Sequence, residues 1–264
     1  MPSPRNYQTE AIITRKTKLG EADTILTLYT PHLGKIQGFA KSLRKPKSKL
    51  AGHLELLTHS MVSLVRGRNL DTITGSQTIS SFLSIKDDLW LTSCALYVVE
   101  LVNQFTAEHI ENYQLFQLLR ETLAQLPQAG NKELVLRYFE LQLLEKSGYR
   151  PQLQECVSCH RALEPTTNYF SPSAGGVLCP DCRATQFAIY PLSVNVQKIL
   201  RLLQNCDFAT VNRIKIDDEL SLQLEKVLSE YVKFLLEKEV KSADWLKNLR
   251  NQRLSLDPSA LPQP

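Results

Sequence analysis

Residues 10–42, "EAIITRKTKLGEADTILTLYTPHLGKIQGFAKS", contain three runs rich in β-branched residues, separated by short turn segments. Gly20 and Gly34 fall at or near the junctions. β-Branched side chains favour extended backbone, and glycine commonly ends a strand. The stretch therefore predicts three consecutive short strands. They cover 10–17, 23–31 and 34–42.

Two more runs of the same kind follow, at 59–67 ("HSMVSLVRG") and 71–80 ("DTITGSQTIS"). Five short strands with no helix between most of them fit a small closed barrel, because closure removes exposed sheet edges. A five-stranded barrel of the OB type has this economy. We expect residues 1–80 to form an OB-fold domain.

The pattern changes from about residue 82 onward. Apolar residues now recur at three- and four-residue steps, which is typical of amphipathic helices. We expect an α+β protein in which residues 81–250 form a helical domain and the Pro- and Ser-rich tail, 251–264, is disordered. The predicted helices are 85–105, 112–126, 131–149, 193–206 and 217–240. We expect one apolar stripe of the last helix to face the core, with a partner-binding groove as the alternative. The stripe comprises Leu220, Leu224, Val227, Tyr231, Phe234 and Leu235.

A cysteine-rich insert, 150–191, interrupts the helical pattern. Its thiols follow the spacing C-x2-C, nineteen residues, C-x2-C, at Cys156, Cys159, Cys179 and Cys182. Two such turns complete the tetrahedral thiolate shell that suits Zn²⁺, and four thiolates leave no position open for water. The spacing predicts one structural Zn²⁺ per chain.

Alternatives at the insert are four unligated thiols, or His160 as a competing ligand. Two further cysteines, Cys94 and Cys206, stand alone in helical stretches. We expect them to be small buried apolar side chains, with reactive thiols as the alternative.

Positive charge is concentrated in the first 80 residues. They carry 12 lysines and arginines against 5 acidic residues, a net of +7, whereas the other 184 residues carry 19 against 22, a net of −3. The density is highest in "AKSLRKPKSKLAG" (40–52), which has no acid and whose Pro46 opposes a regular helix. A segregated basic domain favours nucleic acid or an acidic surface as partner, and a solvated loop is the plain alternative.

Ten cations of this domain are candidates for one nucleic-acid-binding face. Such a face binds phosphates without reading bases and weakens sharply with salt. Few aromatic residues accompany them; we expect Tyr29 and Phe39 in the core, with base stacking as the alternative. The candidate cations are Arg15, Lys16, Lys35, Lys41, Arg44, Lys45, Lys47, Lys49, Arg66 and Arg68.

Other classes of protein find little support. The apolar stretches are broken before the ~20 residues that a membrane span needs, and the N-terminus lacks the apolar core of a signal peptide. We therefore expect a cytoplasmic protein with reduced thiols. The chain has no Gly-rich phosphate loop, H-E-x-x-H or nucleophile elbow, so we expect a non-enzymatic role.

The order of these parts resembles the bacterial RecO family of recombination mediators. The resemblance rests on a "G-E-x-D" turn, a "T-x-x-x-G-K" segment, a basic segment containing serine, and the C-x2-C…C-P-x-C set. In this chain the first three are Gly20, Glu21 and Asp23, then Thr30, Gly34 and Lys35, then Lys41, Arg44, Lys45, Ser48 and Lys49.

The resemblance implies an OB fold, a helical body and a zinc module. It implies a role in DNA repair and homologous recombination of the RecF type: binding single- and double-stranded DNA and annealing complementary strands. With RecR, such proteins help load RecA onto strands coated by single-stranded DNA-binding protein (SSB). The resemblance also implies that the helical part contacts the acidic C-terminal tail of SSB, for which Arg120, Arg137 and Arg150 are candidates. A nucleoid-associated location follows.

Two other functions stay open. In the first, the chain is a non-catalytic adaptor whose basic loop and helical body dock acidic partner peptides. In the second it binds RNA, because an OB barrel alone does not separate RNA from DNA.

Overall fold

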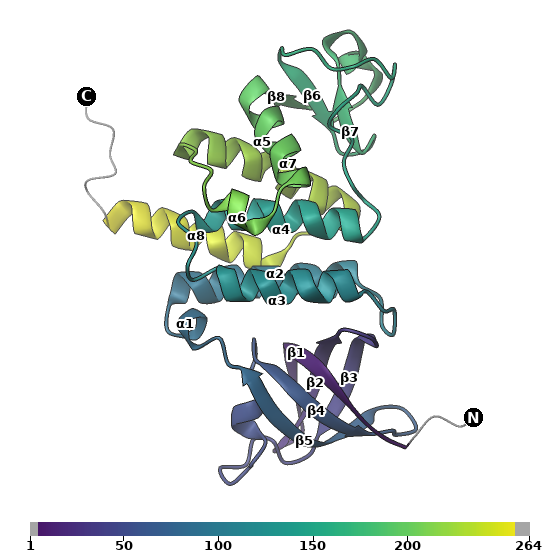
Figure 1. Cartoon of the computed structure of the whole chain (residues 1–264), viewed down its shortest axis with the longest axis vertical. Coiled ribbons are helices and arrows are strands. Elements are labelled where there is room, and N and C mark those ends of the chain that lie inside the picture. The colour runs from purple at the N-terminus through teal and green to yellow at the C-terminus, as the bar shows by residue number, and fades with distance from the viewer. Residues whose placement is uncertain (1–4, 257–264) are drawn as a thin grey trace. The chain divides into compact units, whose positions relative to one another are not determined.

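A computed structural model describes residues 5–256 and divides the chain into two compact units. One unit runs to Ala124 and resumes at Trp245; the other is Gln125–Asp244. The predicted boundary near residue 80 separates strands from helices, whereas the first compact unit also takes in the helices that follow the barrel (Figure 1).

Five strands of the first unit close into a barrel in the order β1-β2-β3-β5-β4, as predicted for an OB-type fold. They are β1 (Asn6–Leu19), β2 (Asp23–Thr30), β3 (Gly34–Ala40), β4 (His59–Val65) and β5 (Asp71–Ser80). The pairings are antiparallel except that of β3 with β5. Strand β1 serves two neighbours, because its first half pairs with β4 and its second half with β2.

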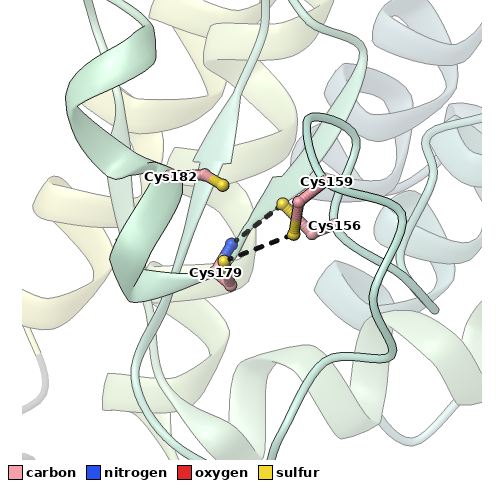
Figure 2. A group of neighbouring side chains, drawn as sticks. All are labelled: Cys156, Cys159, Cys179 and Cys182. Atoms are coloured by element: carbon pink, nitrogen blue, oxygen red, sulfur yellow. Dashed lines mark hydrogen bonds between the residues drawn. The ribbon is translucent and has the colours of Figure 1, made fainter.

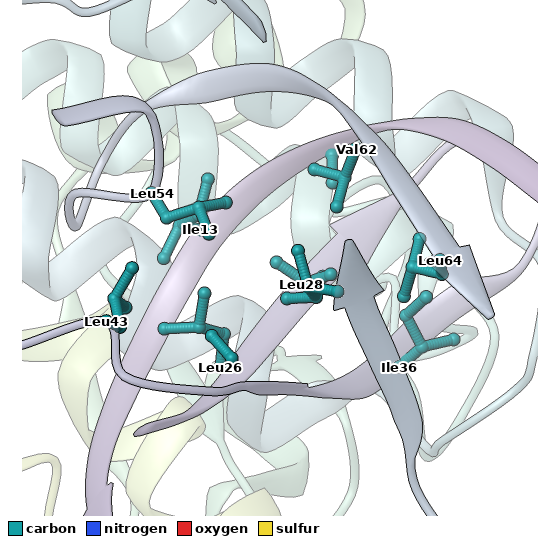
Figure 3. Close-up of a cluster of buried hydrophobic side chains, with 11 residues drawn as sticks. Ile13, Leu26, Leu28, Ile36, Leu43, Leu54, Val62 and Leu64 are labelled. Atoms are coloured by element: carbon teal, nitrogen blue, oxygen red, sulfur yellow. The ribbon is translucent and has the colours of Figure 1, made fainter. Parts of the chain in front are cut away.

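The barrel interior is filled by aliphatic side chains. Alternate residues of β2 and β3 point inward, so that Leu26, Leu28, Ile36 and Ala40 are at most 3% exposed. Figure 3 shows these strands contributing to one cluster together with the long β3–β4 connection. The labelled members are Ile13, Leu26, Leu28, Ile36, Leu43, Leu54, Val62 and Leu64.

Helices bind directly to this barrel, which explains their place in the same unit. Thr14 Oγ1 lies 2.9 Å from Asn103 Oδ1, and the rings of Tyr29 and Phe116 are 6.5 Å apart. The helices are α1 (Leu83–Lys86), α2 (Leu89–Phe105) and α3 (Tyr113–Gln125). Asp88 caps α2 by accepting a hydrogen bond from the Leu91 amide at 2.9 Å.

The last helix, α8 (Lys241–Leu256), was not predicted from the sequence. Its Trp245 Nε1 donates to Ser93 Oγ of α2 at 3.0 Å, and Leu246 is 5% exposed. The helix includes residues 251–256, the first part of the predicted disordered tail. The remainder of that tail, 257–264, lies outside the described residues.

The second unit has a helical body and a small sheet. Its helices are α4 (Lys132–Lys146), α5 (Val194–Asn205), α6 (Phe208–Val211) and α7 (Asp218–Leu236). Every residue of α4 from Leu134 to Leu144 is buried, because α5, α6 and α7 all pack against it. In α7 the buried face includes Leu224, Val227 and Tyr231 as predicted, whereas Phe234 is 48% exposed.

The small sheet belongs to the cysteine insert and has the antiparallel order β7-β6-β8 (Figure 1). Its strands are β6 (Asn168–Ser171), β7 (Gly176–Leu178) and β8 (Tyr190–Leu192), and the short helix η2 covers Pro180–Thr185. Phe170 packs edge-on against Tyr231 of α7 with ring centroids 5.3 Å apart. The insert is therefore fixed to the helical body through its central strand.

Between residues 5 and 256, the structure contains no helix with the length and hydrophobicity needed to cross a membrane.

Candidate metal centre and nucleic-acid surface

The four predicted cysteine ligands meet at one point (Figure 2). The sulfurs of Cys156, Cys159, Cys179 and Cys182 all lie within 4.8 Å of one another, and Cys159 and Cys179 are 3.9 Å apart. A tetrahedral shell with Zn–S bonds of about 2.3 Å needs sulfurs about 3.8 Å apart. The donor set and spacing fit such an ion. Exposed His160 is outside this group, so the thiols alone form it within the described part of the chain.

Two tight turns aim these sulfurs at one another. In the first turn the His160 amide donates to the Cys156 carbonyl at 2.9 Å, with His160 at a φ of 58°. In the second, Cys182 N donates to Cys179 O at 3.1 Å, where Pro180 opens η2. Cys179 N also points at Cys156 Sγ, 3.4 Å away, which joins the two turns directly.

A glycine allows the segments that carry the turns to approach closely. A Cβ on Gly176 would lie 2.5 Å from Gln152 O, closer than real contacts permit. The close approach lets Val177 N donate to Gln152 O and Val157 N donate to Val177 O, both at 2.9 Å. The strand β7 and the first cysteine turn are therefore hydrogen-bonded to each other.

Nearby donors favour the ionised form of some of these thiols. Arg161 lies against Cys159 and lowers the pKa of that thiol to about 6. Burial of Cys156 raises its pKa, but backbone N–H groups of the two turns outweigh this and lower it overall. A hydrogen bond with Cys179 raises the pKa of Cys182 to about 12. Thiolates are the form that binds metal, so Cys159 is prepared for ligation.

The two remaining cysteines lie away from this cluster. Cys94 is fully buried in α2, as predicted, and Cys206 at the end of α5 is partly buried. Burial raises the pKa of the Cys206 thiol, which reduces its reactivity.

The basic loop, defined as residues 41–49, is anchored to the β1–β2 turn. Asp23 Oδ1 accepts a hydrogen bond from Ser42 N at 2.6 Å, and the Arg44 amide donates to Ala22 O at 3.0 Å. The Arg44 guanidinium donates to Gly20 O, while Leu43 enters the core at 3% exposure. These contacts leave five side chains of the loop exposed: Lys41, Arg44, Lys45, Lys47 and Lys49.

Strand pairing brings two more connections toward the basic loop. Ala40, which precedes the loop, pairs with Thr24 just after the β1–β2 turn. Gly38 pairs with Asp71, just after the β4–β5 turn. The exposed Arg66 and Arg68 occupy that second turn. Two connections that carry positive charge, the basic loop and the β4–β5 turn, therefore meet near the end of β3, beside the β1–β2 turn with its exposed Glu21.

Besides Arg44, which binds Gly20 O, two of the ten candidate cations have partners within the chain. Lys35 Nζ donates to Asn103 O at 2.7 Å and to Thr106 O, both at the C-terminal end of α2. Lys16 Nζ forms an ion pair with Glu55 at 2.9 Å. Both contacts place a charge where it stabilises the fold. Arg15 is exposed, and Arg66 stacks over the Tyr7 ring with its Cζ 5.0 Å from the centroid.

The "T-x-x-x-G-K" segment has a structural role that its sequence did not reveal. Thr30 Oγ1 donates to Gly34 O at 2.9 Å and accepts from Leu33 N at 3.0 Å, which closes the β2–β3 turn. Gly34 has a φ of +63°, and a Cβ there would lie 2.0 Å from Ile110 O. Lys35 then caps α2. The motif joins the barrel to the helices that follow it.

Some other candidate residues have different surroundings from those expected. Phe39 points out of the barrel and is partly exposed, whereas Tyr29 is fully buried as predicted. Arg137 is 5% exposed and its guanidinium donates to Glu140 at 2.5 Å, so its position is internal. Arg150 pairs with Glu145 at 2.7 Å on the surface.

Comparison with known proteins gives consistent matches over both parts of the chain. Residues 3–82 match the family model "Recombination protein O N terminal" and residues 86–244 match "Recombination protein O C terminal". A DNA repair protein RecO of Dehalococcoides mccartyi strain CBDB1 is 53% identical over 95% of this chain and 98% of its own. Another, of Roseiflexus sp. strain RS-1, is 38% identical over 97% and 90%. The chain belongs to the RecO family of DNA repair proteins.

Proposed function

We propose that this protein binds single- and double-stranded DNA through the basic loop and anneals complementary strands during recombinational repair. The observation that carries the proposal is the anchored loop at the end of β3, with five exposed cations and no acid between residues 41 and 49. Arg66 and Arg68 extend the same positive region by strand pairing. Membership of the RecO family supports a role in DNA repair.

Four of the five acids of the first 80 residues have partners within the fold, and the fifth, Glu21, is exposed in the β1–β2 turn that anchors the basic loop. Glu10 contacts His59, Asp23 holds Ser42 N, Glu55 pairs with Lys16, and Asp71 accepts from Tyr7. Cations that neutralise phosphates without reading bases reduce the repulsion between two strands, while the base edges stay free to pair. Such a surface suits annealing at any sequence.

We propose that the four cysteines hold one structural Zn²⁺. The close set of four sulfur donors supports this ion and leaves no open coordination position for a substrate. The bound ion would fix the two turns of a sheet whose strands are only 3 or 4 residues long. We accordingly propose a non-catalytic protein.

Family membership also supports a set of partners and a location. We propose that the protein works in the bacterial cytoplasm, near the nucleoid, with RecR, and helps RecA to load on single strands coated by SSB. We assign the contact with the acidic SSB tail to the helical body. The exposed Arg150 is a better candidate for that contact than Arg137, which is buried beside an acid.

A salt series on DNA binding tests the proposed function. We compare the protein with a variant in which Lys41, Arg44, Lys45, Lys47 and Lys49 are alanine. Each phosphate-contacting cation contributes about 0.7 to the slope of log K against log salt on single strands. We expect weaker binding and a shallower slope in the variant, and loss of annealing of complementary oligonucleotides.

The control replaces Lys16, which is paired with Glu55, by alanine. We expect this change to affect the slope little. Unchanged DNA affinity in the five-site variant would contradict the proposal. If the five-site variant kept its DNA affinity but lost binding to an acidic SSB-tail peptide, the adaptor function would replace the DNA-binding function.

A further inference from the structure

A row of side chains crosses the outer face of the barrel beside the basic loop. Phe39 of β3 pairs with Ile25 of β2 on one side and with Thr72 of β5 on the other, and Ile25 in turn pairs with Thr17 of β1. Each of the four is at least partly exposed. Phe39 and Ile25 therefore form an apolar patch in the middle of a polar row.

The orientation of Phe39 follows from the pleat of β3. Its neighbours Gly38 and Ala40 point inward, where a Cβ on Gly38 would lie 2.8 Å from the side chain of Ile73. Successive residues of a strand point to opposite faces, so Phe39 points outward. Large aromatic side chains normally enter the core. Here the core side of β3 at this level is filled by Ile73, and the ring remains on the surface.

Cations border the patch on two sides. The adjacent outward row holds the exposed Arg15, whose partner Thr27 pairs with Gln37. The basic loop begins with Lys41, two residues after Phe39. The Phe39 ring therefore lies between cations that can bind the phosphates of a polynucleotide.

We propose that Phe39, supported by Ile25, is a platform on which bases of single-stranded nucleic acid stack. The inference rests on the proposed function and adds a preference within it: unpaired bases can reach the ring, whereas the bases of a duplex are already stacked on one another. Aromatic–base stacking tolerates any sequence, because every base has a π-face. The platform would hold single strands in a form ready to pair.

The test compares two single-stranded probes of equal length, oligo(dT) and an abasic oligomer with the same phosphates. In Phe39→Leu, which keeps an apolar side chain beside Ile25, we expect affinity for oligo(dT) to fall at least about fivefold, the lower end of the loss of one aromatic–base stack. Affinity for the abasic oligomer should change by less than about twofold, because its contacts are to phosphate alone. Tyr113→Leu removes another exposed aromatic of the same unit and should change neither.

Equal losses on both probes, or no loss on either, would overturn the platform. The five-site alanine variant distinguishes its failure from failure of the proposed function: that variant should weaken both probes even if Phe39→Leu weakens neither. Phe39→Trp gives a second measurement. The fluorescence of the introduced tryptophan should be quenched by oligo(dT) and not by the abasic oligomer. Equal quenching by the two probes would also overturn the proposal.

Discussion

Arg161 Nε lies 3.4 Å from the Sγ of Cys159, and the Nη2 of the same guanidinium donates to Asp181 Oδ2 at 2.9 Å. Asp181 lies between the two cysteines of the second turn. Arg161 therefore joins both halves of the four-cysteine cluster from outside. A cation in this position stabilises thiolate and fixes the ligand's direction, as outer-shell partners of metal sites do.

Replacing Arg161 by glutamine should weaken metal binding. Without the guanidinium, the pKa of Cys159 rises from about 6, so a proton competes better with the metal. We expect roughly a tenfold loss of zinc affinity at neutral pH, and release of the ion at a higher pH than in the original protein. Competition with a chromogenic chelator across a pH series measures both.

Arg183→Gln is the matched control. Arg183 is an exposed arginine of the same insert, but its guanidinium lies over the Tyr169 ring and donates to that tyrosine's hydroxyl. We expect zinc affinity close to that of the original protein. A loss as large as that of Arg161→Gln would mean that general positive charge, and not the contact with Cys159, matters.

Cys156→Ser should remove the metal and loosen the insert. Cys156 is fully buried and its sulfur accepts from Cys179 N, so its loss breaks both the shell and the link between turns. Metal analysis should find about one zinc in the original protein and none in the variant. Hydrogen exchange should increase across residues 152–192 and stay unchanged in the barrel.

Cys94→Ser is the control for this experiment, because Cys94 is buried in α2, outside the metal cluster. It should keep its zinc. Metal retained after all four cluster cysteines are replaced would refute the thiolate site.

Gly34→Ala should destabilise the barrel strongly. Alanine is strained at a φ of +63°, and its Cβ would also collide with the backbone oxygen of Ile110. Gly20→Ala carries the same kind of strain at a φ of +53° with nothing within 4 Å, so it should cost only about 1–2 kcal/mol. We expect Gly34→Ala to lower the free energy of unfolding by several kcal/mol, measured by urea denaturation. Similar losses in both variants would show that the contact with Ile110 is not tight.

The strands of the barrel could be predicted because local chemistry and long-range pairing agree there. Alternating β-branched residues and glycine turns place β2 and β3 within two residues of their observed ends. The start of β1 was missed, because Asn6–Thr9 become a strand only by pairing with β4, more than 50 residues later. Helix α8 was missed for the same reason: its polar sequence buries Leu246, and its half-exposed Trp245 binds Ser93, only when the helix meets α2.

The candidate sites differ in how far the sequence determines them. Cysteine spacing alone predicted the four-sulfur cluster, since ligand chemistry leaves few alternatives. A count of lysines and arginines cannot separate Lys35, which caps α2, from Lys41, which faces solvent. Likewise the outward direction of Phe39 depends on strand register, which is fixed only when the barrel closes.

Mild acid should lower the thermal stability of the first compact unit, because His59 is buried there. This side chain is 5% exposed, and burial lowers its pKa more than the adjacent Glu10 raises it; Arg120 lowers it further. The unfolded chain therefore takes up a proton near pH 6.5 more readily than the folded one. As a result, the free energy of unfolding has its full value above that pH and decreases as the pH falls below it. Between about pH 7.5 and pH 5 we expect Tm to fall by about 3 °C or more, and the fall to shrink in His59→Gln. His32→Gln, at a histidine whose side chain is 69% exposed, should leave the slope unchanged. If Tm depended on pH identically in His59→Gln and in the original protein, His59 would not be the source of that dependence.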